Sequence, residues 1–247
     1  MDSNIGETEA LIKIYEDLAE RIDHTLVAPD LTGEQVAAGC RIATDFEVAC
    51  VTVRPCDVEF AARLVDGSKV AVGSVVGFPH GCSTTATKLY ETRDLMRRGA
   101  REIDAVVNIG KLIDRQFQHI DTELQQLAEA CEEYGATLKV VLETGYLTDD
   151  LKIVASRIAA RARVHCLTTS TGFGLRDATL DDVRLLRQHT SPEVGIKAAG
   201  GISTLAQAIE FCESGSARIG TTATAAILTE WKKTLAGRSK NVPAEGA

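Results

Sequence analysis

The chain has 247 residues, of which 45% are hydrophobic and 25% charged, a balance typical of a globular protein with a substantial core. Its formal net charge of −8 argues against nucleic acid as a partner, because a phosphate backbone requires a basic face. No apolar run approaches the ~18 residues that a membrane-spanning helix needs, so we expect no membrane partner either.

Eight short apolar runs follow a predicted leading helix over about 7–20. Each run is followed by a turn and then by a stretch with helical periodicity. The runs are rich in Val and Ile without clean alternation, which is typical of strands buried on both faces of a parallel sheet. They occupy residues 21–26, 48–53, 69–78, 102–109, 138–143, 164–170, 194–199 and 218–221.

Helix start and stop signals lie between these runs. Hydroxyl residues suited to cap a helix N-terminus occur at Thr148, at Thr179 and at the pair Ser203 and Thr204. Glycines at 99, 135 and 215 stand just before the next run, where a left-handed C-cap is useful. These signals place a helix after each strand.

Eight strand–helix units in succession predict an α/β protein, a (β/α)8 TIM barrel with a short N-terminal helix. An open doubly wound sheet is the alternative arrangement of the same elements. No linker or low-complexity segment interrupts the series, so we expect a single domain over 1–247. The barrel proper is predicted at about 21–236, and the polar stretch 237–247 is predicted to be a loose tail.

Seven cysteines, an odd number without a CxxC pair, are scattered along the chain, and the five histidines are also dispersed. This pattern favours free thiols in a reducing compartment over disulfides or a zinc site. The first residues mix acids with apolar side chains and lack the basic start of a secretory signal. We therefore expect a cytoplasmic protein without a metal or another cofactor.

Of the charged residues inside the apolar runs, Asp23, Asp104 and Lys197 are the candidates for a functional role. A buried charge must be paired or hydrogen-bonded, so one interpretation is that Asp104 and Lys197 simply pair in the core. The other is that a lysine with a lowered pKa adds to a carbonyl to form an imine while carboxylates move protons. Catalytic groups of such barrels lie at the carboxyl ends of strands, but the spacing leaves both interpretations open.

Glycines at two strand-to-helix turns indicate an anion site. Gly200 and Gly201 follow the seventh run, and Thr171 and Gly172 follow the sixth. Glycine lets backbone amides approach an anion, although ordinary tight turns use glycine as well. Glu143 is interpreted as a hydrogen bonder in the pocket wall, and the histidines at 24, 80 and 165 as supporting residues.

Motifs along the barrel read IDHTL at 22–26, VVGFP at 75–79, EID and NIG within 102–110, ETG at 143–145, TSTGF at 169–173 and KAAGGI at 197–202. In this order they resemble the deoxyribose-phosphate aldolase family over about residues 21–228. The resemblance implies a metal-free class I aldol cleavage of 2-deoxyribose 5-phosphate into glyceraldehyde 3-phosphate and acetaldehyde. It implies a proton-shuttling role for Asp104, an assisting role for Asp23, and for Lys197 that of a second lysine which lowers the pKa of the nucleophile.

The resemblance also implies a phosphate site and, as in the family, a homodimer. The substrate-binding residues expected on this basis are Thr171, Gly172, Gly200, Gly201, Thr222 and Ala223. The loop 220–224 departs from the family pattern, because one small hydroxyl residue is lost and Thr224 adds bulk. We therefore predict weaker selectivity for the 5-phosphate than the family has.

The largest departure lies at the end of the sixth run. The family reads Lys-Thr-Ser-Thr-Gly, whereas this chain has Thr168 in the place of the lysine, and a hydroxyl cannot form an imine. We then expect Lys197 to be the only ammonium of the site and to titrate higher than a paired lysine.

Three hypotheses follow for a chain that acts on a small carbonyl or sugar-phosphate substrate. The first is a diverged carbon–carbon lyase in which Lys197 forms the imine. The second is a proton-transfer or dehydration enzyme on another small carbonyl compound, with Asp104 and Lys197 as acid and base. The third is a non-catalytic ligand-binding barrel, since a fold alone does not decide function.

Overall fold

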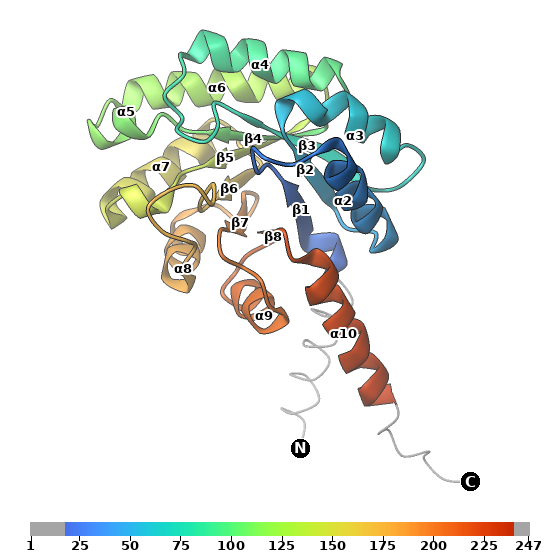
Figure 1. Cartoon of the computed structure of the whole chain (residues 1–247). Coiled ribbons are helices and arrows are strands. Elements are labelled where there is room, and N and C mark those ends of the chain that lie inside the picture. The colour runs from blue at the N-terminus through green and yellow to red at the C-terminus, as the bar shows by residue number, and fades with distance from the viewer. Residues whose placement is uncertain (1–17, 240–247) are drawn as a thin grey trace, which may run out of the picture.

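The computed structural model describes residues 18–239, which form a closed barrel of eight parallel strands with the helices outside it (Figure 1). The strands follow one another around the barrel in chain order, and the last pairs with the first. They are β1 (Ile22–Leu26), β2 (Cys50–Val53), β3 (Ala71–Val76), β4 (Glu102–Val106), β5 (Thr137–Val141), β6 (Cys166–Thr168), β7 (Gly195–Ala199) and β8 (Arg218–Thr221). The predicted TIM barrel is confirmed, and the open doubly wound sheet is wrong.

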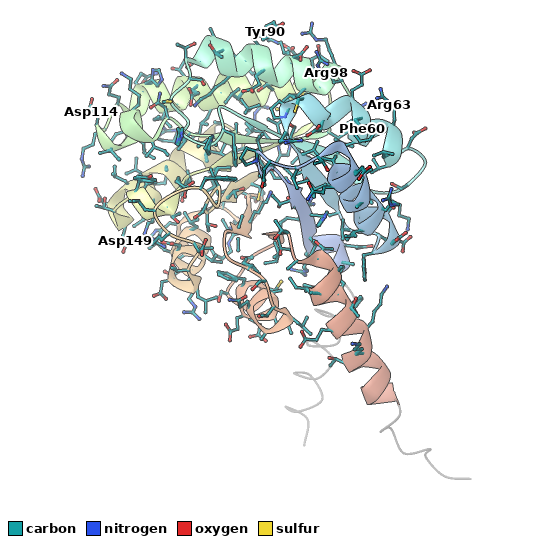
Figure 2. The ribbon with its side chains drawn as sticks, in the orientation of Figure 1. Phe60, Arg63, Tyr90, Arg98, Asp114 and Asp149 are labelled. Atoms are coloured by element: carbon teal, nitrogen blue, oxygen red, sulfur yellow. The ribbon has the colours of Figure 1, made fainter. Side chains whose placement is uncertain are left out.

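Helices connect consecutive strands and cover the outside of the barrel (Figure 1). They are α2 (Gly33–Asp45), α3 (Val58–Leu64), α4 (Thr85–Arg97), α5 (Ile109–Ile113), α6 (Phe117–Glu133), α7 (Asp149–Arg161), α8 (Leu180–His189), α9 (Leu205–Glu213) and α10 (Thr224–Ser239), with short 3-10 turns at η1 (Ala19–Arg21), η2 (Pro55–Asp57) and η3 (Thr144–Tyr146). Side chains such as Tyr90 of α4 and Arg63 of α3 lie on the outer surface (Figure 2). Among the helices of residues 18–239, none is both long and apolar enough to span a membrane.

All eight predicted runs contain a strand, but four of them extend past its end, namely 69–78, 102–109, 138–143 and 164–170. The strand β3 ends at Val76 because Gly77 adopts a φ of +61°, which turns the chain out of the sheet. The strand β4 ends at Val106 because Asn108 caps α5, its side chain accepting a hydrogen bond of 3.2 Å from the N–H of Lys111.

Most predicted helix signals are confirmed. Thr179 accepts a hydrogen bond from the N–H of Asp182 at 3.1 Å, and Thr204 forms a capping box with Gln207. Thr148 stands at the N-cap of α7, but it makes no cap hydrogen bond because its hydroxyl bonds to the side chain of Asp150. The glycines at 99, 135 and 215 all have positive φ, as a left-handed C-cap requires.

The predicted ends of the chain are only partly tested. The leading helix over about 7–20 lies mostly outside the described residues, and its described end is the 3-10 turn η1. The tail prediction begins too early, because α10 continues through Gly237 to Ser239. A single glycine in a helix costs only about 1 kcal/mol, which its neighbours can offset. Residues 240–247 lie outside the described residues.

The two sides of the strands differ sharply in chemistry. Toward the helices the strands contribute fully buried apolar side chains such as those of Val51, Ile103 and Ile196. Charged side chains from the same strands, such as Asp104 and Lys197, are also buried and contact one another across the barrel. Because successive side chains of a strand point to opposite faces, one set builds the core and the other fills the barrel interior.

Candidate active site

Three acids and three bases from five strands form a connected cluster inside the barrel. They are Asp23, Glu102, Asp104, Lys139, Lys197 and Arg218. Three negative and three positive formal charges sum to zero, so the cluster is balanced when all six groups are ionised. Buried ion pairs are tolerated only when every charge has a partner, and here each has one.

Lys197 contacts both carboxylates that the sequence analysis singled out. Its Nζ lies 2.7 Å from Asp23 Oδ2 and 3.1 Å from each carboxylate oxygen of Asp104. Burial by itself lowers the pKa of Lys197, but the carboxylates of Asp104 and Asp23 outweigh it and raise the pKa above its ordinary value. In the free protein Lys197 is therefore protonated at neutral pH.

Lys139 is a second ammonium in this cluster, so the expectation that Lys197 stands alone is wrong. Lys139 forms ion pairs with Asp23 and Glu102, and its Nζ lies 3.9 Å from Asp104 Oδ2. Its like charge opposes the effect of the carboxylates on the pKa of Lys197. Lys139 was not among the predicted site residues, although it lies in the middle of β5 just as Lys197 lies in the middle of β7.

The other two missed residues, Glu102 and Arg218, lie at strand starts. Arg218 donates to Asp23 Oδ1 at 2.5 Å and to Glu102 Oε2 at 2.9 Å. The signal that could have found them is the one that singled out Asp104, namely a charged residue next to apolar ones in a strand. Lys139, Lys197 and Arg218 together lower the pKa of Asp23 below its usual range, although burial alone would raise it. Asp23 thus stays ionised and holds the two lysines in place.

Strand register places Thr168 directly beside Lys197. In the barrel Thr168 of β6 pairs with Lys197 of β7 on one side and with Val141 of β5 on the other. Its side chain is buried, and its hydroxyl donates a long hydrogen bond of 3.5 Å to Asp104 Oδ1. The polar group at position 168 therefore faces the same carboxylate that Lys197 contacts.

A small cavity of 40 Å³ gives access to this part of the cluster. Asp104, Thr168 and Lys197 line it together with Ser170, whose hydroxyl has no hydrogen-bond partner among residues 18–239. Lys139 does not line this cavity. Of the two lysines in the cluster, Lys197 is thus the one that borders this cavity.

A larger cavity of 620 Å³ adjoins the small one, and the two share Thr25, Val27, Thr171 and Ala199 in their linings. Of the residues expected to bind substrate, Thr171, Gly172, Gly200, Gly201 and Thr222 line it. The φ angles of Gly200 and Gly201 are +104° and +73°, which other residues rarely adopt. The structure therefore joins the predicted glycine turns and the charged cluster into one continuous site.

Ala223, which was expected to bind substrate, does not line this cavity, and neither does Thr224. The N–H of Ala223 donates to Thr221 Oγ1 at 2.9 Å, which ties it into the turn before α10. Thr224 is fully buried, and its hydroxyl bonds to Nδ1 of His24 at 2.9 Å. The extra bulk at position 224 thus fills the space next to His24 and cannot explain weaker phosphate selectivity.

The loop after β6 is held by Glu143, as the sequence analysis expected for a residue of the pocket wall. Glu143 has a left-handed backbone with φ of 53°, and its carboxylate accepts hydrogen bonds from both the N–H and the hydroxyl of Thr171. His165 accepts a hydrogen bond from the N–H of Leu138 near the start of its strand, and His80 is exposed in a loop. Neither of these two histidines lines the small cavity.

One group of side chains in residues 18–239 has the spacing of a metal site, namely Asp23, Cys50 and Glu102. Its two carboxylates are already neutralised by Lys139 and Arg218. Burial raises the pKa of the Cys50 thiol well above its ordinary value, so it does not supply the thiolate that a metal binds. The group does not fit a metal ion.

A family model described as DeoC/LacD family aldolase matches residues 18–229, a range that includes all eight strands. The chain belongs to this family. A deoxyribose-phosphate aldolase of Bacteroides thetaiotaomicron is 40% identical over 234 residues, covering 95% of this chain and 98% of the relative. Another from Thermococcus gammatolerans is 41% identical over 207 residues, covering 83% and 92%. The tetrameric deoxyribose phosphate aldolase from Aeropyrum pernix superposes with a TM-score of 0.83 at 29% identity, covering 89% of this chain and 93% of that one.

This aldolase is thus a carbon–carbon lyase of the deoxyribose-phosphate aldolase type. A lyase that works without a metal needs an electron sink and a group that moves protons. The barrel interior offers a lysine and a carboxylate 3.1 Å apart at the end of a cavity, which meets both needs.

Proposed function

We propose that this aldolase cleaves a sugar resembling 2-deoxyribose 5-phosphate into a shorter aldehyde and acetaldehyde, with Lys197 as the imine-forming residue. The observation that carries the proposal is the position of Lys197, which lines the small cavity while Lys139 does not. A second support is the carboxylate of Asp104 at 3.1 Å, close enough to exchange protons with the reacting atoms.

We also propose that Thr168 occupies the place of the imine-forming lysine of the family. The supports are the motif at 168–172, which resembles the family's motif except at its first residue, and the register of β6 and β7. Because Thr168 and Lys197 are direct partners on adjacent strands, a carbonyl carbon between them can be reached from either strand. A lysine on β7 can therefore take over the role of a lysine on β6 while the substrate stays in the same position.

The chemistry then runs through the neutral amine of Lys197. Its nitrogen adds to the aldehyde carbon, and loss of water gives a protonated imine that accepts electrons. Removal of the proton from the hydroxyl two carbons away breaks the carbon–carbon bond, releases the first aldehyde and leaves an enamine on Lys197. Protonation of the enamine and hydrolysis by water release acetaldehyde and regenerate the amine, with Asp104 moving the protons.

The test is reductive trapping. Incubation with acetaldehyde and sodium borohydride, followed by peptide mass spectrometry, is expected to locate the adduct on Lys197. Lys197→Ala should abolish trapping, whereas the control Lys69→Ala, at an exposed lysine outside both cavities, should leave it unchanged. An adduct on another lysine, or one that persists in Lys197→Ala, would refute the assignment.

One observation favours a second candidate function. The raised pKa of Lys197 suits an ion pair with Asp104 that acts as acid and base in proton transfer or dehydration of another small carbonyl compound. Exchange of substrate hydrogen with deuterated water, in the absence of any trapped adduct, would support this candidate. Ligand binding with neither exchange nor trapping would support the third hypothesis, a non-catalytic ligand-binding barrel. Membership in an aldolase family disfavours this hypothesis.

Asp104→Asn is expected to lower turnover about 100-fold or more, because the amide cannot accept and return a proton. Its shape is nearly the same and Lys197 keeps Asp23 as a partner at 2.7 Å, so the barrel should still fold, although the lost charge lowers the melting temperature. Steady-state kinetics and thermal melts of this variant are compared with Asp66→Asn, a surface control in the loop before β3. A variant with a much lower melting temperature that keeps its activity when folded would indicate that the ion pair of Asp104 and Lys197 is purely structural.

Assembly and location remain predictions for this chain. A relative from Aeropyrum pernix is tetrameric, and a homodimer is our expectation here. A cytoplasmic location agrees with seven cysteines that are all free thiols, as a reducing compartment favours.

A further inference from the structure

The large cavity contains a carboxylate that the proposed reaction does not use. Asp177 lies in the loop between β6 and α8, and its side chain rests against the two glycines after β7. A Cβ added to Gly201 would lie 2.5 Å from Asp177 Oδ2, and one added to Gly200 would lie 3.4 Å from Oδ1. This carboxylate forms no hydrogen bond or ion pair with any residue from 18 to 239.

Within the described part of the chain, no cation in the lining of the cavity offsets this charge. The ionisable residues of the lining are Asp177 and His24. Burial lowers the pKa of His24 to about 4, so its imidazole is neutral at physiological pH. The net charge of the lining is therefore negative.

Arg176, the cation next to Asp177 in the chain, is paired with a different carboxylate. The guanidinium of Arg176 donates to both carboxylate oxygens of Asp182, at 2.6 and 3.1 Å. Lys152 lies 2.8 Å from the same carboxylate. Arg176 and Lys152 both line a separate surface hollow and not the large cavity, so neither reaches the glycine turns.

Much of the remaining lining is apolar. The segment after β1 and the inner face of α2 supply most of this wall, and Ile202 adds to it from the opposite side. The larger apolar members are Leu26, Val27, Leu31, Ile42, Phe173 and Ile202. Such a wall suits a substrate end that carries no charge.

We propose that Asp177 makes the far end of this site select an uncharged, hydroxyl-bearing substrate over a phosphorylated one. The inference rests on the proposed function and narrows it, since the preferred substrate becomes an unphosphorylated 2-deoxy aldose. A phosphate dianion at Gly200 and Gly201 would meet the unpaired carboxylate of Asp177 at close range, and like charges only a few ångströms apart repel even near the protein surface. A terminal hydroxyl can instead donate a hydrogen bond to the carboxylate, which is stronger than one between neutral groups.

The first measurement compares kcat/KM for 2-deoxyribose and for 2-deoxyribose 5-phosphate. We expect the unaltered chain to prefer 2-deoxyribose, and Asp177→Asn to raise kcat/KM for the phosphate ester about tenfold or more. The same variant should lower kcat/KM for 2-deoxyribose about threefold to tenfold, because the hydrogen bond from the terminal hydroxyl loses its charged acceptor. Asp181→Asn removes an equal charge from a highly exposed carboxylate outside the cavity and should change neither value.

The second measurement is binding of inorganic phosphate by calorimetry, which does not depend on turnover. Asp177→Asn should bind phosphate at least about tenfold tighter than the unaltered chain, whereas Asp181→Asn should match the unaltered chain. If this difference appears but neither sugar is cleaved, the proposed function fails and the charge selection at Asp177 stands. A strong preference of the unaltered chain for the phosphorylated sugar, or equal phosphate affinity of the unaltered chain and of Asp177→Asn, would overturn the inference.

Discussion

Thr168→Lys is expected to raise the cleavage of 2-deoxyribose and of its 5-phosphate by about 100-fold. The new side chain would start from a buried position that lines the small cavity, next to Lys197. The surrounding cluster already balances three acids with three bases, so an additional ammonium would leave an uncompensated positive charge. Burial and like charge therefore lower the pKa of a lysine at 168, so that part of it is a neutral amine near pH 7.

Thr168→Met is the matched control, because methionine is long and flexible like lysine but carries no amine. It should show no gain of activity. In Thr168→Lys the borohydride adduct should move from Lys197 to residue 168, and peptide mass spectrometry would detect the change. A folded Thr168→Lys protein that cleaves no faster and is still trapped on Lys197 would contradict the idea that position 168 faces the substrate carbonyl.

Turnover of the unaltered chain is expected to rise about tenfold per pH unit between about pH 7 and pH 9. Only a neutral amine attacks a carbonyl, and the pKa of Lys197 is raised above its ordinary value. Loss of its proton would leave three acids facing two bases in the cluster, which is why the charged form is favoured. The neutral fraction therefore increases throughout this window and has no plateau within it.

The measurement is kcat/KM across this pH range, with thermal melts at each pH to verify that the barrel stays folded. Thr168→Lys should flatten the profile, because its reactive amine has a lower pKa. A flat profile in the unaltered chain would mean that the reactive group is already unprotonated at pH 7. Lys197 held by Asp23 and Asp104 does not meet that condition, so the assignment would then be wrong.

Several residues of the site could be recognised from sequence because a charge inside an apolar strand needs a partner. This argument identified Asp23, Asp104 and Lys197, and the structure brings all three into contact. Lys139 carries the same signal, because it too lies between apolar residues inside a strand. Asp177 carried no such signal, since an exposed acid in a polar loop is ordinary in a sequence.

The order of strands and helices was determined by the sequence alone, because burial on both faces, helix periodicity, caps and glycine turns are local properties of the chain. Only the tertiary structure decided which side chains meet. The register of β6 and β7 pairs Thr168 with Lys197, and the path of the loop after β6 sets Asp177 against Gly201. The tertiary structure also decided that Thr224 contacts His24 and does not line the cavity, because these two residues are far apart in the sequence. A shift of register by one residue moves every side chain of a strand to its other face, and no local pattern in the sequence encodes that choice between distant segments.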